Sequence, residues 1–420
     1  MTVSRILGLG TYPIRKPIHG GQRRVTAFKE FYDRHGIAYT YICLYNGAHY
    51  GTSDVGPHDR PFDPSQIEPW LANLFGDVLS GQQAATDPAT FQHFSQIMDR
   101  LEPDALQLEQ PFMWPLAKRL RQLSGRRKSR LIYSSHNVET PLKRAILLSC
   151  GVGQELRNSI CSQIEDIEVE IAREADLIVC VSESDAEYYR CELKSSSPVV
   201  VVRNGTDRPE RCASPSPPDA LSRFENRPYL MTVGSAHIPN IEGLCHYVIK
   251  DGVFFVPPVP SFVICGGIAN SIYHRSEYQC YQAANSRRVQ FFADLTDPEL
   301  AAIKQGCHGV FLPIRDGGGT NLKTAEALAL GKWVVATSTA MRGFETFLRT
   351  DGVVIADTPS DFRQAMRHVL ERPPLELNAA SRGARDALYW DRCFDDSTLP
   401  KVFDAVQRQT PEPELSRALR

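Results

Sequence analysis

The residues with the clearest chemical pattern follow the apolar, strand-like run Val310 to Ile314. Three consecutive glycines come after this run, and a helical pattern begins near Thr320. Glycine lets the backbone approach an anion closely, and the amides at a helix N-terminus carry partial positive charge. The segment therefore predicts a phosphate-binding loop, formed by Gly317, Gly318, Gly319, Thr320, Asn321 and Leu322.

Two charged residues follow this loop within the predicted helix. Lys323 can add a full positive charge and stabilise a diphosphate leaving group without a metal ion. Glu326 is three residues further on, so both side chains share one helix face, and its carboxylate can accept hydrogen bonds from ribose hydroxyls. A solvated Lys–Glu pair beside a flexible turn is the simpler alternative. The loop follows a predicted parallel strand at its carboxyl end, where open α/β sheets bind ligands, and this favours the site.

A parallel sheet is needed to position these residues. Ile6 to Gly10 and Ala38 to Tyr45 predict strands on either side of a helix from Gln22 to His35, which is a βαβ unit. The pattern recurs along the first half of the chain. The other elements expected there are strands Leu131 to Ser135, Asp176 to Val181 and Val199 to Val202, a helix from about Gln154 to Glu174, and a short helix before the last strand.

A second α/β domain is expected after a linker at residues 206–227, which are rich in Pro, Ser, Asp and Arg. We therefore predict domains at 1–205 and 228–388, with a tail at 389–420 that packs back on the first domain. The strands expected in the second domain are Tyr229 to Val233, Phe262 to Cys265, Val289 to Phe292, Val310 to Ile314 and Trp333 to Ala336, and the chain is expected to be helical from Asp361.

Composition sets further limits on the class of protein. A chain of 420 residues exceeds one ordinary hydrophobic core, and 42% hydrophobic with 23% charged residues is typical of a globular protein. The net charge of -2 gives no general attraction to nucleic acid, so no nucleic-acid partner is expected. No apolar run is long enough for a membrane span or a signal peptide. Eleven cysteines without a C-x-x-C pair indicate reduced thiols in a cytoplasmic protein, buried where they lie in apolar runs, as at Cys43, Cys180 and Cys265.

The glycine-loop segment resembles the donor-binding signature of the family 4 glycosyltransferases, in the branch with a GGGTNLK-type loop. The resemblance follows nearly the whole chain in order. The further motifs that carry it are HGGQRR (19–24), SSHNVET with His136, EIAREADLIVCVSESD (170–185), VVVVRNGTD (199–207), MTVGSAHIPNIEGL (231–244) and TSTAMRGFE (337–345).

Membership of this family implies the GT-B fold, in which two Rossmann-like domains face each other across a cleft. It implies transfer of a sugar from a nucleotide-sugar donor to an acceptor hydroxyl with retention of anomeric configuration, without a metal or other cofactor. His136 resembles the family's active-site histidine beside the donor sugar, and Gly20 and Gly21 resemble its Gly-Gly loop near donor and acceptor. The implied donor is a UDP-, GDP- or dTDP-sugar. A glycan or lipid-linked acceptor, in polysaccharide or glycoconjugate biosynthesis, fits the motifs as well as a small molecule does.

Two departures from the family pattern concern the contacts to diphosphate. Gly318 stands where many members have a glutamate, and Pro239 and Asn240 replace a Lys-Gly pair after the strand that opens the second domain. Two other functions therefore stay open. One is a nucleotide-sugar 2-epimerase of the same architecture, and the other is a non-catalytic subunit that binds nucleotide sugar.

Other residues have simpler explanations beside their functional ones. Gly20 and Gly21 also fit a plain turn, and a lone histidine such as His136 is often a buried residue bonded to backbone. Asn204 and Gly205 are expected to form a hinge turn without chemistry. Basic residues at 118–130 follow the aromatic segment PFMWP, so peripheral contact with the inner face of a membrane is the alternative to a solvated turn.

Overall fold

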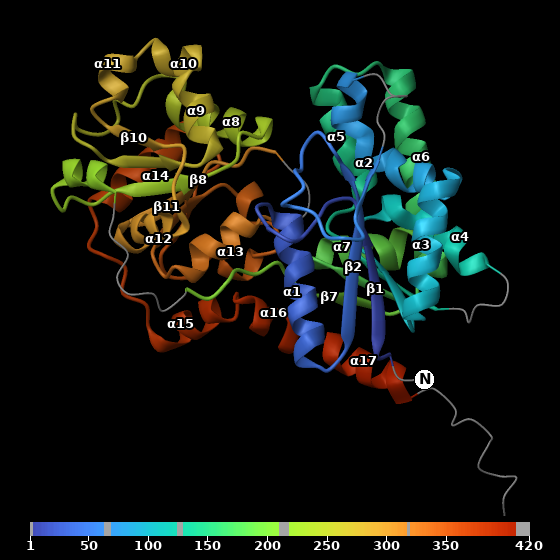
Figure 1. The fold of residues 1–420 in the computed structure, drawn as a ribbon. Helices are drawn as coiled ribbons and strands as arrows, with labels where there is room; N and C mark the ends of the chain where they lie inside the picture. Colours follow the sequence, from blue (N-terminus) through green and yellow to red (C-terminus); the bar gives the residue numbers. More distant parts are fainter. Residues whose placement is uncertain (1–2, 63–68, 124–128, 210–217, 317–319, 409–420) are drawn as a thin grey trace, which may run out of the picture. The chain divides into compact units, whose positions relative to one another are not determined.

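The computed structural model describes residues 3–62, 69–123, 129–209, 218–316 and 320–408. Contacts divide the chain into two compact units, one of residues 1–203 with 393–420 and one of residues 204–392. Each unit is built on one parallel sheet with helices on its faces (Figure 1). The predicted α/β class with two Rossmann-like domains is therefore confirmed.

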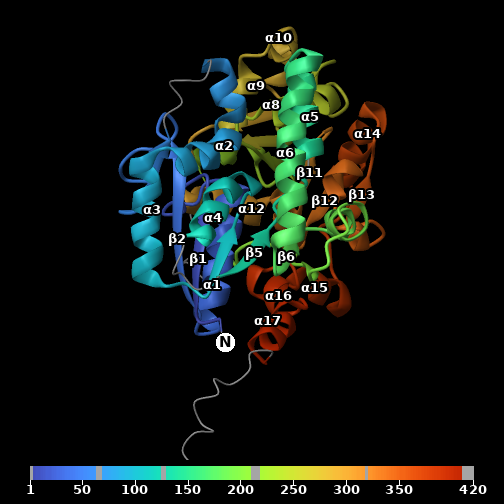
Figure 2. The ribbon, with the colours of Figure 1, turned by 90° about the vertical axis from the view of Figure 1, so that its right-hand side faces the viewer.

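The first unit contains a seven-stranded sheet in the order β3-β2-β1-β4-β5-β6-β7, and all neighbouring strands are parallel. The strands are β1 (Arg5–Gly10), β2 (Ala38–Asn46), β3 (Arg60–Phe62), β4 (Ala105–Leu108), β5 (Arg130–Ser134), β6 (Leu177–Cys180) and β7 (Val199–Val201). The helices are α1 (Gly20–Arg34), α2 (Pro69–Thr86), α3 (Pro88–Leu101), α4 (Trp114–Gln122), α5 (Glu139–Ser149), α6 (Gln154–Glu174), α7 (Glu183–Glu187) and α17 (Leu399–Arg408), with short turns η1 (Pro111–Met113) and η2 (Tyr188–Glu192). Helices α5 and α6 lie side by side in both views (Figures 1 and 2).

The second unit contains a six-stranded parallel sheet in the order β10-β9-β8-β11-β12-β13. Its strands are β8 (Leu230–Val233), β9 (Phe262–Cys265), β10 (Val289–Phe292), β11 (Gly309–Leu312), β12 (Trp333–Ala336) and β13 (Val353–Ile355). Its helices are α8 (Ile238–Leu244), α9 (Gly267–Tyr273), α10 (Ser276–Gln279), α11 (Gln282–Asn285), α12 (Asp297–Gly306), α13 (Leu322–Ala329), α14 (Pro359–Leu370) and α15 (Ala379–Asp386), with turns η3 (Asp219–Phe224), η4 (Cys245–Ile249), η5 (Thr339–Met341) and η6 (Glu345–Phe347). Helix α16 (Trp390–Asp395) leads out of this unit.

All ten strands predicted from the sequence are present, three with the predicted ends and the others with ends shifted by one or two residues. Strands β3, β4 and β13 were not predicted. Strand β4 (Ala105–Leu108) has the sequence ALQL, in which Gln107 interrupts the apolar residues, and Glu109 and Gln110 follow it directly, so no continuous apolar run stands out.

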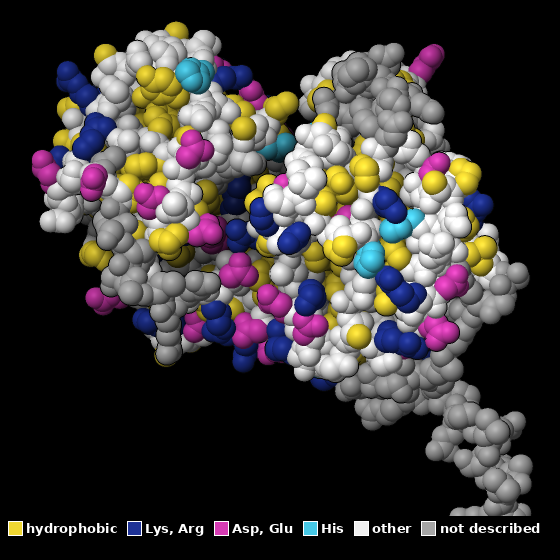
Figure 3. All heavy atoms as spheres, viewed as in Figure 1, with side chains coloured by type: hydrophobic (Ala, Val, Ile, Leu, Met, Phe, Trp, Pro, Cys, Tyr) yellow, Lys and Arg dark blue, Asp and Glu magenta, His cyan; other side chains and the backbone are white. Residues whose placement is uncertain are grey.

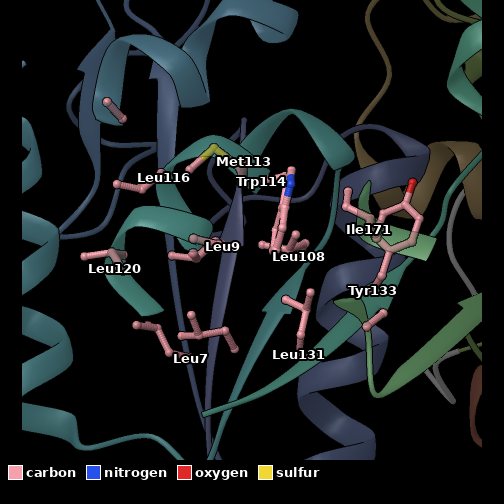
Figure 4. Packing of buried hydrophobic residues seen from close by; sticks show 14 of the residues in the cluster. Leu7, Leu9, Leu108, Met113, Trp114, Leu116, Leu120, Leu131, Tyr133 and Ile171 are labelled. Atoms are coloured by element: carbon pink, nitrogen blue, oxygen red, sulfur yellow. The ribbon is translucent and has the colours of Figure 1, made fainter. Parts of the chain in front are cut away.

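The core of the first unit is formed by side chains from its strands and from the segment around α4. Leu7, Leu9, Leu108 and Leu131 come from neighbouring strands and belong to the same buried cluster as Trp114 (Figure 4). Trp114 is 2% exposed, and its Nε1 donates a hydrogen bond to Glu170 Oε2 at 2.7 Å.

The burial of Trp114 corrects one expectation about the membrane. Phe112 and Trp114 belong to the PFMWP segment, and both are buried in the protein, so they cannot provide an aromatic membrane contact. Residues 124–128 of the neighbouring basic stretch lie outside the described residues. No helix in the described part of the chain is long and apolar enough to cross a bilayer.

The mixed charges on the described surface and the burial of three cysteines agree with what the composition predicts. Lys and Arg side chains alternate with Asp and Glu side chains on the face shown in Figure 3. Cys43, Cys180 and Cys265 are buried free thiols, as expected from their apolar surroundings in the sequence.

The tail residues Phe394 and Phe403 pack on helix α1 of the first unit. Phe394 lies 4.8 Å from Phe28 and 5.1 Å from Phe31, measured between ring centroids, and Phe403 contacts Phe31 and Tyr32. Val25, Phe28 and Phe31 form the apolar face of α1, which is covered by this tail as well as by the sheet.

A glycine in α2 provides a test of this packing. A Cβ atom at Gly81 would lie 1.9 Å from the carbonyl oxygen of Phe112. Gly81→Ala should therefore lower the free energy of unfolding by about 1–3 kcal/mol, because two backbones must move apart. Thermal unfolding checks this, with Gly383→Ala in α15 as the control, since nothing lies within 4 Å of the added methyl there. Equal unfolding temperatures for the two variants would contradict the α2 packing.

Candidate functional site

A polar cluster lies at the carboxyl edge of the first sheet. Tyr12 follows β1, Glu109 follows β4, and His136 follows β5, and the carboxyl ends of these adjacent parallel strands meet at one edge. His136 Nε2 lies 3.2 Å from Glu109 Oε2, and His136 Nδ1 lies 3.2 Å from the Tyr12 hydroxyl. The predicted site residue His136 therefore belongs to a cluster of three groups.

Glu109 is the fully buried centre of this cluster. Its Oε1 accepts hydrogen bonds from the Tyr39 hydroxyl at 2.8 Å and from Gln107 Nε2 at 2.6 Å. A buried carboxylate is stable only when such donors replace water. Burial lowers the pKa of His136, and Glu109 offsets only part of that effect, so the imidazole is neutral near pH 7.

The predicted glycines Gly20 and Gly21 begin helix α1. His19 is its N-cap and forms a capping box with Gln22. A Cβ atom at Gly21 would lie 2.2 Å from the Tyr12 hydroxyl, so this position requires glycine while Tyr12 occupies its place. Burial lowers the pKa of His19 to about 4, so His19 is also neutral at pH 7.

Glu139 is a second buried acid, three residues after His136 and at the start of α5. It is 6% exposed, and Asn137 Nδ2 lies 3.3 Å from its Oε1. Burial raises the pKa of Glu139 from 4.5 to about 7; Lys143 lowers it, while Asp77 and Glu168 raise it further. A carboxyl that titrates near neutral pH therefore stands beside the His136 segment.

The second unit places Lys323 in a desolvated position. Lys323 is the second residue of α13, whose N-cap is Asn321, and its Nζ donates a hydrogen bond to Asn240 Oδ1 at 2.8 Å. Burial lowers the pKa of Lys323 from 10.5 to about 8, with a smaller opposing effect of Glu326. The amine is therefore mostly charged at pH 7, at the positive end of a helix.

A small cavity lies beside this lysine. Its volume is about 20 Å³, room for roughly one water molecule. Lys323 and Asn240 supply its polar wall with Thr232, and a Cβ atom added at Gly234 would lie 3.3 Å from Lys323 Nζ. Asn240, one of the two residues that stand in place of the family's Lys-Gly pair, thus holds the amine of Lys323.

Glu326 does not pair directly with Lys323 through a hydrogen bond. Its Oε1 forms an ion pair with Lys304 of α12, and its side chain is 29% exposed. This pair fixes one carboxylate oxygen of Glu326 at the surface of α13.

Thr320, which belongs to the predicted phosphate-binding loop, is bound by Asn204, a residue that we expected only to form a hinge turn. Asn204 Nδ2 donates to Thr320 Oγ1 at 2.8 Å and lies 3.2 Å from the Thr320 carbonyl oxygen. Both residues are buried. Leu322 begins α13, whereas Gly317, Gly318 and Gly319 lie outside the described residues.

Two family models match the chain. The model "Glycosyltransferase Family 4" matches residues 18–209, and the model "Glycosyl transferases group 1" matches residues 227–372. Between them they leave uncovered only the first 17 residues, a short stretch between the two matches, and the tail. The chain belongs to the glycosyltransferases.

Solved structures of GT-B enzymes are similar to this glycosyltransferase over nearly its full length. Sucrose-phosphate synthase from Thermosynechococcus elongatus has a TM-score of 0.67 at 15% identity, with 97% of this chain and 100% of that chain covered. WaaG, a glycosyltransferase involved in lipopolysaccharide biosynthesis, has 0.57 at 12%, covering 97% and 100%. Anabaena HepE in complex with UDP has 0.57 at 12%, covering 96% and 99%. At these identities the likeness concerns the GT-B fold, and no curated protein matches the chain.

The sequence did not single out four residues that complete the two clusters of this glycosyltransferase. Tyr12 and Glu109 complete the His136 cluster, while Asn240 and Asn204 hold Lys323 and Thr320. A signal existed for two of them, since Asn240 is one of the two residues in place of the family's Lys-Gly pair and Asn204 belongs to a family motif. Glu109 follows a strand that was not recognised, and Tyr12 is one of fifteen tyrosines.

The described residues of the glycosyltransferase contain no group of three or more His, Cys, Asp or Glu side chains that could hold a metal ion. The independence from metals implied by the family resemblance stays a prediction.

The raised pKa of Glu139 makes the stability of the glycosyltransferase depend on pH. Between pH 4.5 and 7 this carboxyl ionises in the unfolded chain but stays neutral in the fold, so the wild type loses stability as pH rises through this window. Glu139→Gln cannot ionise. Its stability gain over the wild type should be small at pH 4.5 and reach about 3 kcal/mol above pH 7. Unfolding temperatures across this range test this, with exposed Glu155→Gln as the control, and parallel curves for wild type and Glu139→Gln would contradict it.

The bond between Asn204 and Thr320 predicts a second stability effect. Asn204→Ala leaves the buried Thr320 carbonyl and hydroxyl without this donor, which should lower the free energy of unfolding by about 1–3 kcal/mol. Asn158→Ala removes an exposed amide at 3.5 Å from Arg144 and serves as the control. Urea unfolding compares the two, and a loss no greater in Asn204→Ala than in Asn158→Ala would count against the contact.

Proposed function

We propose that this glycosyltransferase moves a sugar from a nucleotide-sugar donor to an acceptor hydroxyl with retention of anomeric configuration. The observation that carries the proposal is the half-buried, partly desolvated amine of Lys323 at the N-terminus of α13, next to the carboxyl ends of β8 and β11. Open parallel sheets bind nucleotides at this edge, and a helix N-terminus favours phosphate.

The leaving diphosphate gives Lys323 its proposed role. Negative charge grows on the diphosphate as the bond to the sugar breaks, and a desolvated cation stabilises that charge more strongly than one in water. Asn240 accepts one N–H of the Lys323 ammonium, which leaves two more N–H groups to donate to phosphate oxygens. We assign the second oxygen of Glu326 to the ribose hydroxyls, because Lys304 already binds the first.

The His136 cluster supplies a different environment for the sugar. We propose that the neutral imidazole positions the donor sugar by shape and by its dipole, not as a general base. Its low pKa and its contacts with Glu109 and Tyr12 support this assignment. Retention, as implied by the family, then needs no nucleophile from the protein, because the acceptor hydroxyl attacks from the face that the diphosphate leaves.

UDP is the first nucleotide to test. Two similar structures of Anabaena HepE contain UDP, one of them with glucose, and a similar trehalose-phosphate synthase from Burkholderia vietnamiensis is described as UDP-forming. The sugar and the acceptor, whether glycan, lipid-linked or small, would be found by screening with the matching UDP-sugars.

Thermal-shift titration with UDP, GDP, dTDP and ADP, followed by product analysis with the matching sugars, tests the proposal. A bound nucleotide raises the unfolding temperature by mass action. Transfer to an acceptor would support the proposal. Conversion of the donor to an isomer without an acceptor would favour an epimerase, and binding with neither transfer nor hydrolysis would favour a non-catalytic subunit.

The charge on Lys323 predicts a pH dependence of nucleotide binding. The protonated amine binds diphosphate, and its pKa is about 8, so UDP affinity should fall as pH rises from 7 to 9. Lys323→Met should bind UDP about tenfold or more weakly at pH 7, on the scale of one lost charge-assisted contact, and should lack this pH dependence. Calorimetric titration at each pH measures both effects.

Exposed Lys250 of the same unit provides the matched control, since Lys250→Met removes an equal charge away from α13. Glu326→Ala should lower kcat/KM by about tenfold or more, on the same scale. Wild-type UDP affinity and pH dependence in Lys323→Met would remove this lysine from the proposed site.

A further inference from the structure

We propose that Tyr12 is a positioning residue that, together with Glu109, holds His136 in a single tautomer with the proton on Nε2, and that position 21 is a glycine because the Tyr12 hydroxyl occupies the space of a side chain there. The inference deepens the proposed function by naming what fixes the histidine. It rests on that function only for the expected effect on turnover, because the tautomer itself is a property of the folded first unit.

The first step concerns the proton on His136 Nε2. Glu109 Oε1 accepts from Tyr39 and Gln107, and Glu109 Oε2 lies 3.2 Å from His136 Nε2. A carboxylate only accepts hydrogen bonds, so the nitrogen that faces it must be the donor. The proton of the neutral imidazole is therefore on Nε2.

The second step follows for the other ring nitrogen. A neutral imidazole carries one proton, so Nδ1 of His136 is a bare acceptor. The only group recorded within hydrogen-bond distance of that nitrogen in the described structure is the Tyr12 hydroxyl, at 3.2 Å. Burial raises the pKa of Tyr12 well above its ordinary value, so the hydroxyl keeps its proton and donates it to Nδ1.

The third step gives the direction of the hydrogen bond at the other side of Tyr12. Gln110 Oε1 accepts from the backbone N–H of Thr11 at 2.9 Å, which places the amide nitrogen of Gln110 on the other side. That nitrogen donates to the Tyr12 oxygen at 2.6 Å. The donors therefore run in one direction, from Gln110 to Tyr12, from Tyr12 to His136, and from His136 to Glu109.

The Tyr12 hydroxyl is held in place by the surrounding backbone and rings. The Tyr12 carbonyl oxygen accepts from the Tyr41 hydroxyl at 2.7 Å, and the Tyr12 ring packs edge-on against His19 with centroids 4.7 Å apart. The hydroxyl lies over Gly21, where a Cβ atom would be 2.2 Å away. A tyrosine ring is rigid, so alanine at position 21 would force the hydroxyl away from His136.

A consequence follows for the proposed reaction. Both ring nitrogens of His136 are engaged by protein groups, so the histidine offers the sugar a fixed neutral surface and not a proton acceptor. One acceptor lone pair of the Tyr12 oxygen is not used by the recorded bonds and can receive a substrate hydroxyl. The loss of Tyr12 should therefore lower kcat more than it raises the donor KM.

The experiment is ¹⁵N NMR of the full-length protein with labelled histidine, with His136 assigned through His136→Gln. In the wild type, His136 should show a protonated Nε2 and a bare Nδ1. In Tyr12→Phe the hydrogen bond to Nδ1 is absent, so the Nδ1 resonance should move toward that of an unbonded nitrogen. Gly21→Ala should give the same change, because the methyl displaces the hydroxyl.

Tyr188→Phe, a tyrosine of the same unit outside this cluster, is the control and should leave the His136 signals unchanged. Unfolding temperatures verify that the variants are folded. A wild-type His136 with its proton on Nδ1, or an unchanged spectrum in folded Tyr12→Phe, would overturn the inference.

Kinetics provide a second readout. Tyr12→Phe should lower kcat/KM by about tenfold, the scale of one hydrogen bond between polar groups, mainly through kcat. Wild-type kinetics in Tyr12→Phe would overturn the role in positioning. The NMR measurement needs no substrate, so the expected spectra in a protein without transferase activity would count against the proposed function alone.

Discussion

Parallel strand pairing is the constraint on which the rest of the structure depends. Each parallel pair needs a crossover, so all carboxyl ends of a sheet lie at one edge and residues distant in sequence meet there. In the first unit this edge brings Tyr12, Glu109 and His136 together, across more than 120 residues of chain. In the second unit it brings the start of α13 to α8, the helix that follows β8, so that Lys323 meets Asn240. The strand topology thus determines which side chains meet in both clusters.

Burial then decides the charge state of the groups at those edges. Desolvation lowers the pKa of His136 and Lys323 and raises that of Glu139, so in each case the neutral form is favoured over the charged one. The resulting charge states at pH 7 differ because the ordinary pKa values of histidine, lysine and glutamate differ. His136 becomes neutral at pH 7, Lys323 stays mostly charged but loses its proton more easily, and Glu139 titrates near neutrality. Three residues within the motifs that resemble the family thereby acquire three electrostatic roles that their residue types alone do not specify.

The sequence was sufficient for the fold and for the residues that carry a motif. Apolar runs identified ten strands, and helical spacing identified helices, because both signals are local in the sequence. His136 and Lys323 were found through motifs. Glu109 was not, because it follows the four-residue β4, and its importance depends on donors from β2 and β4 that only the folded sheet supplies. Asn204 was given no role, because its bond to Thr320 joins residues more than 100 positions apart. Local sequence patterns predict helices and strands, whereas contacts between residues distant in the sequence become visible only once the strands are paired.

The presence of Asn240 in place of a residue of the family's Lys-Gly pair illustrates how such partners change the meaning of a motif. A second lysine at this position would place a like charge near a desolvated ammonium, which would depress the pKa of Lys323 below about 8 and reduce its charge at neutral pH. Asn240 instead accepts a hydrogen bond from that ammonium, which favours its charged form. A single lysine whose charged form is stabilised by a hydrogen bond can therefore bind diphosphate, whereas two neighbouring lysines would lower each other's pKa. The departure from the family pattern weakens the net charge beside α13, but it also removes a repulsion, and this is compatible with a working diphosphate site.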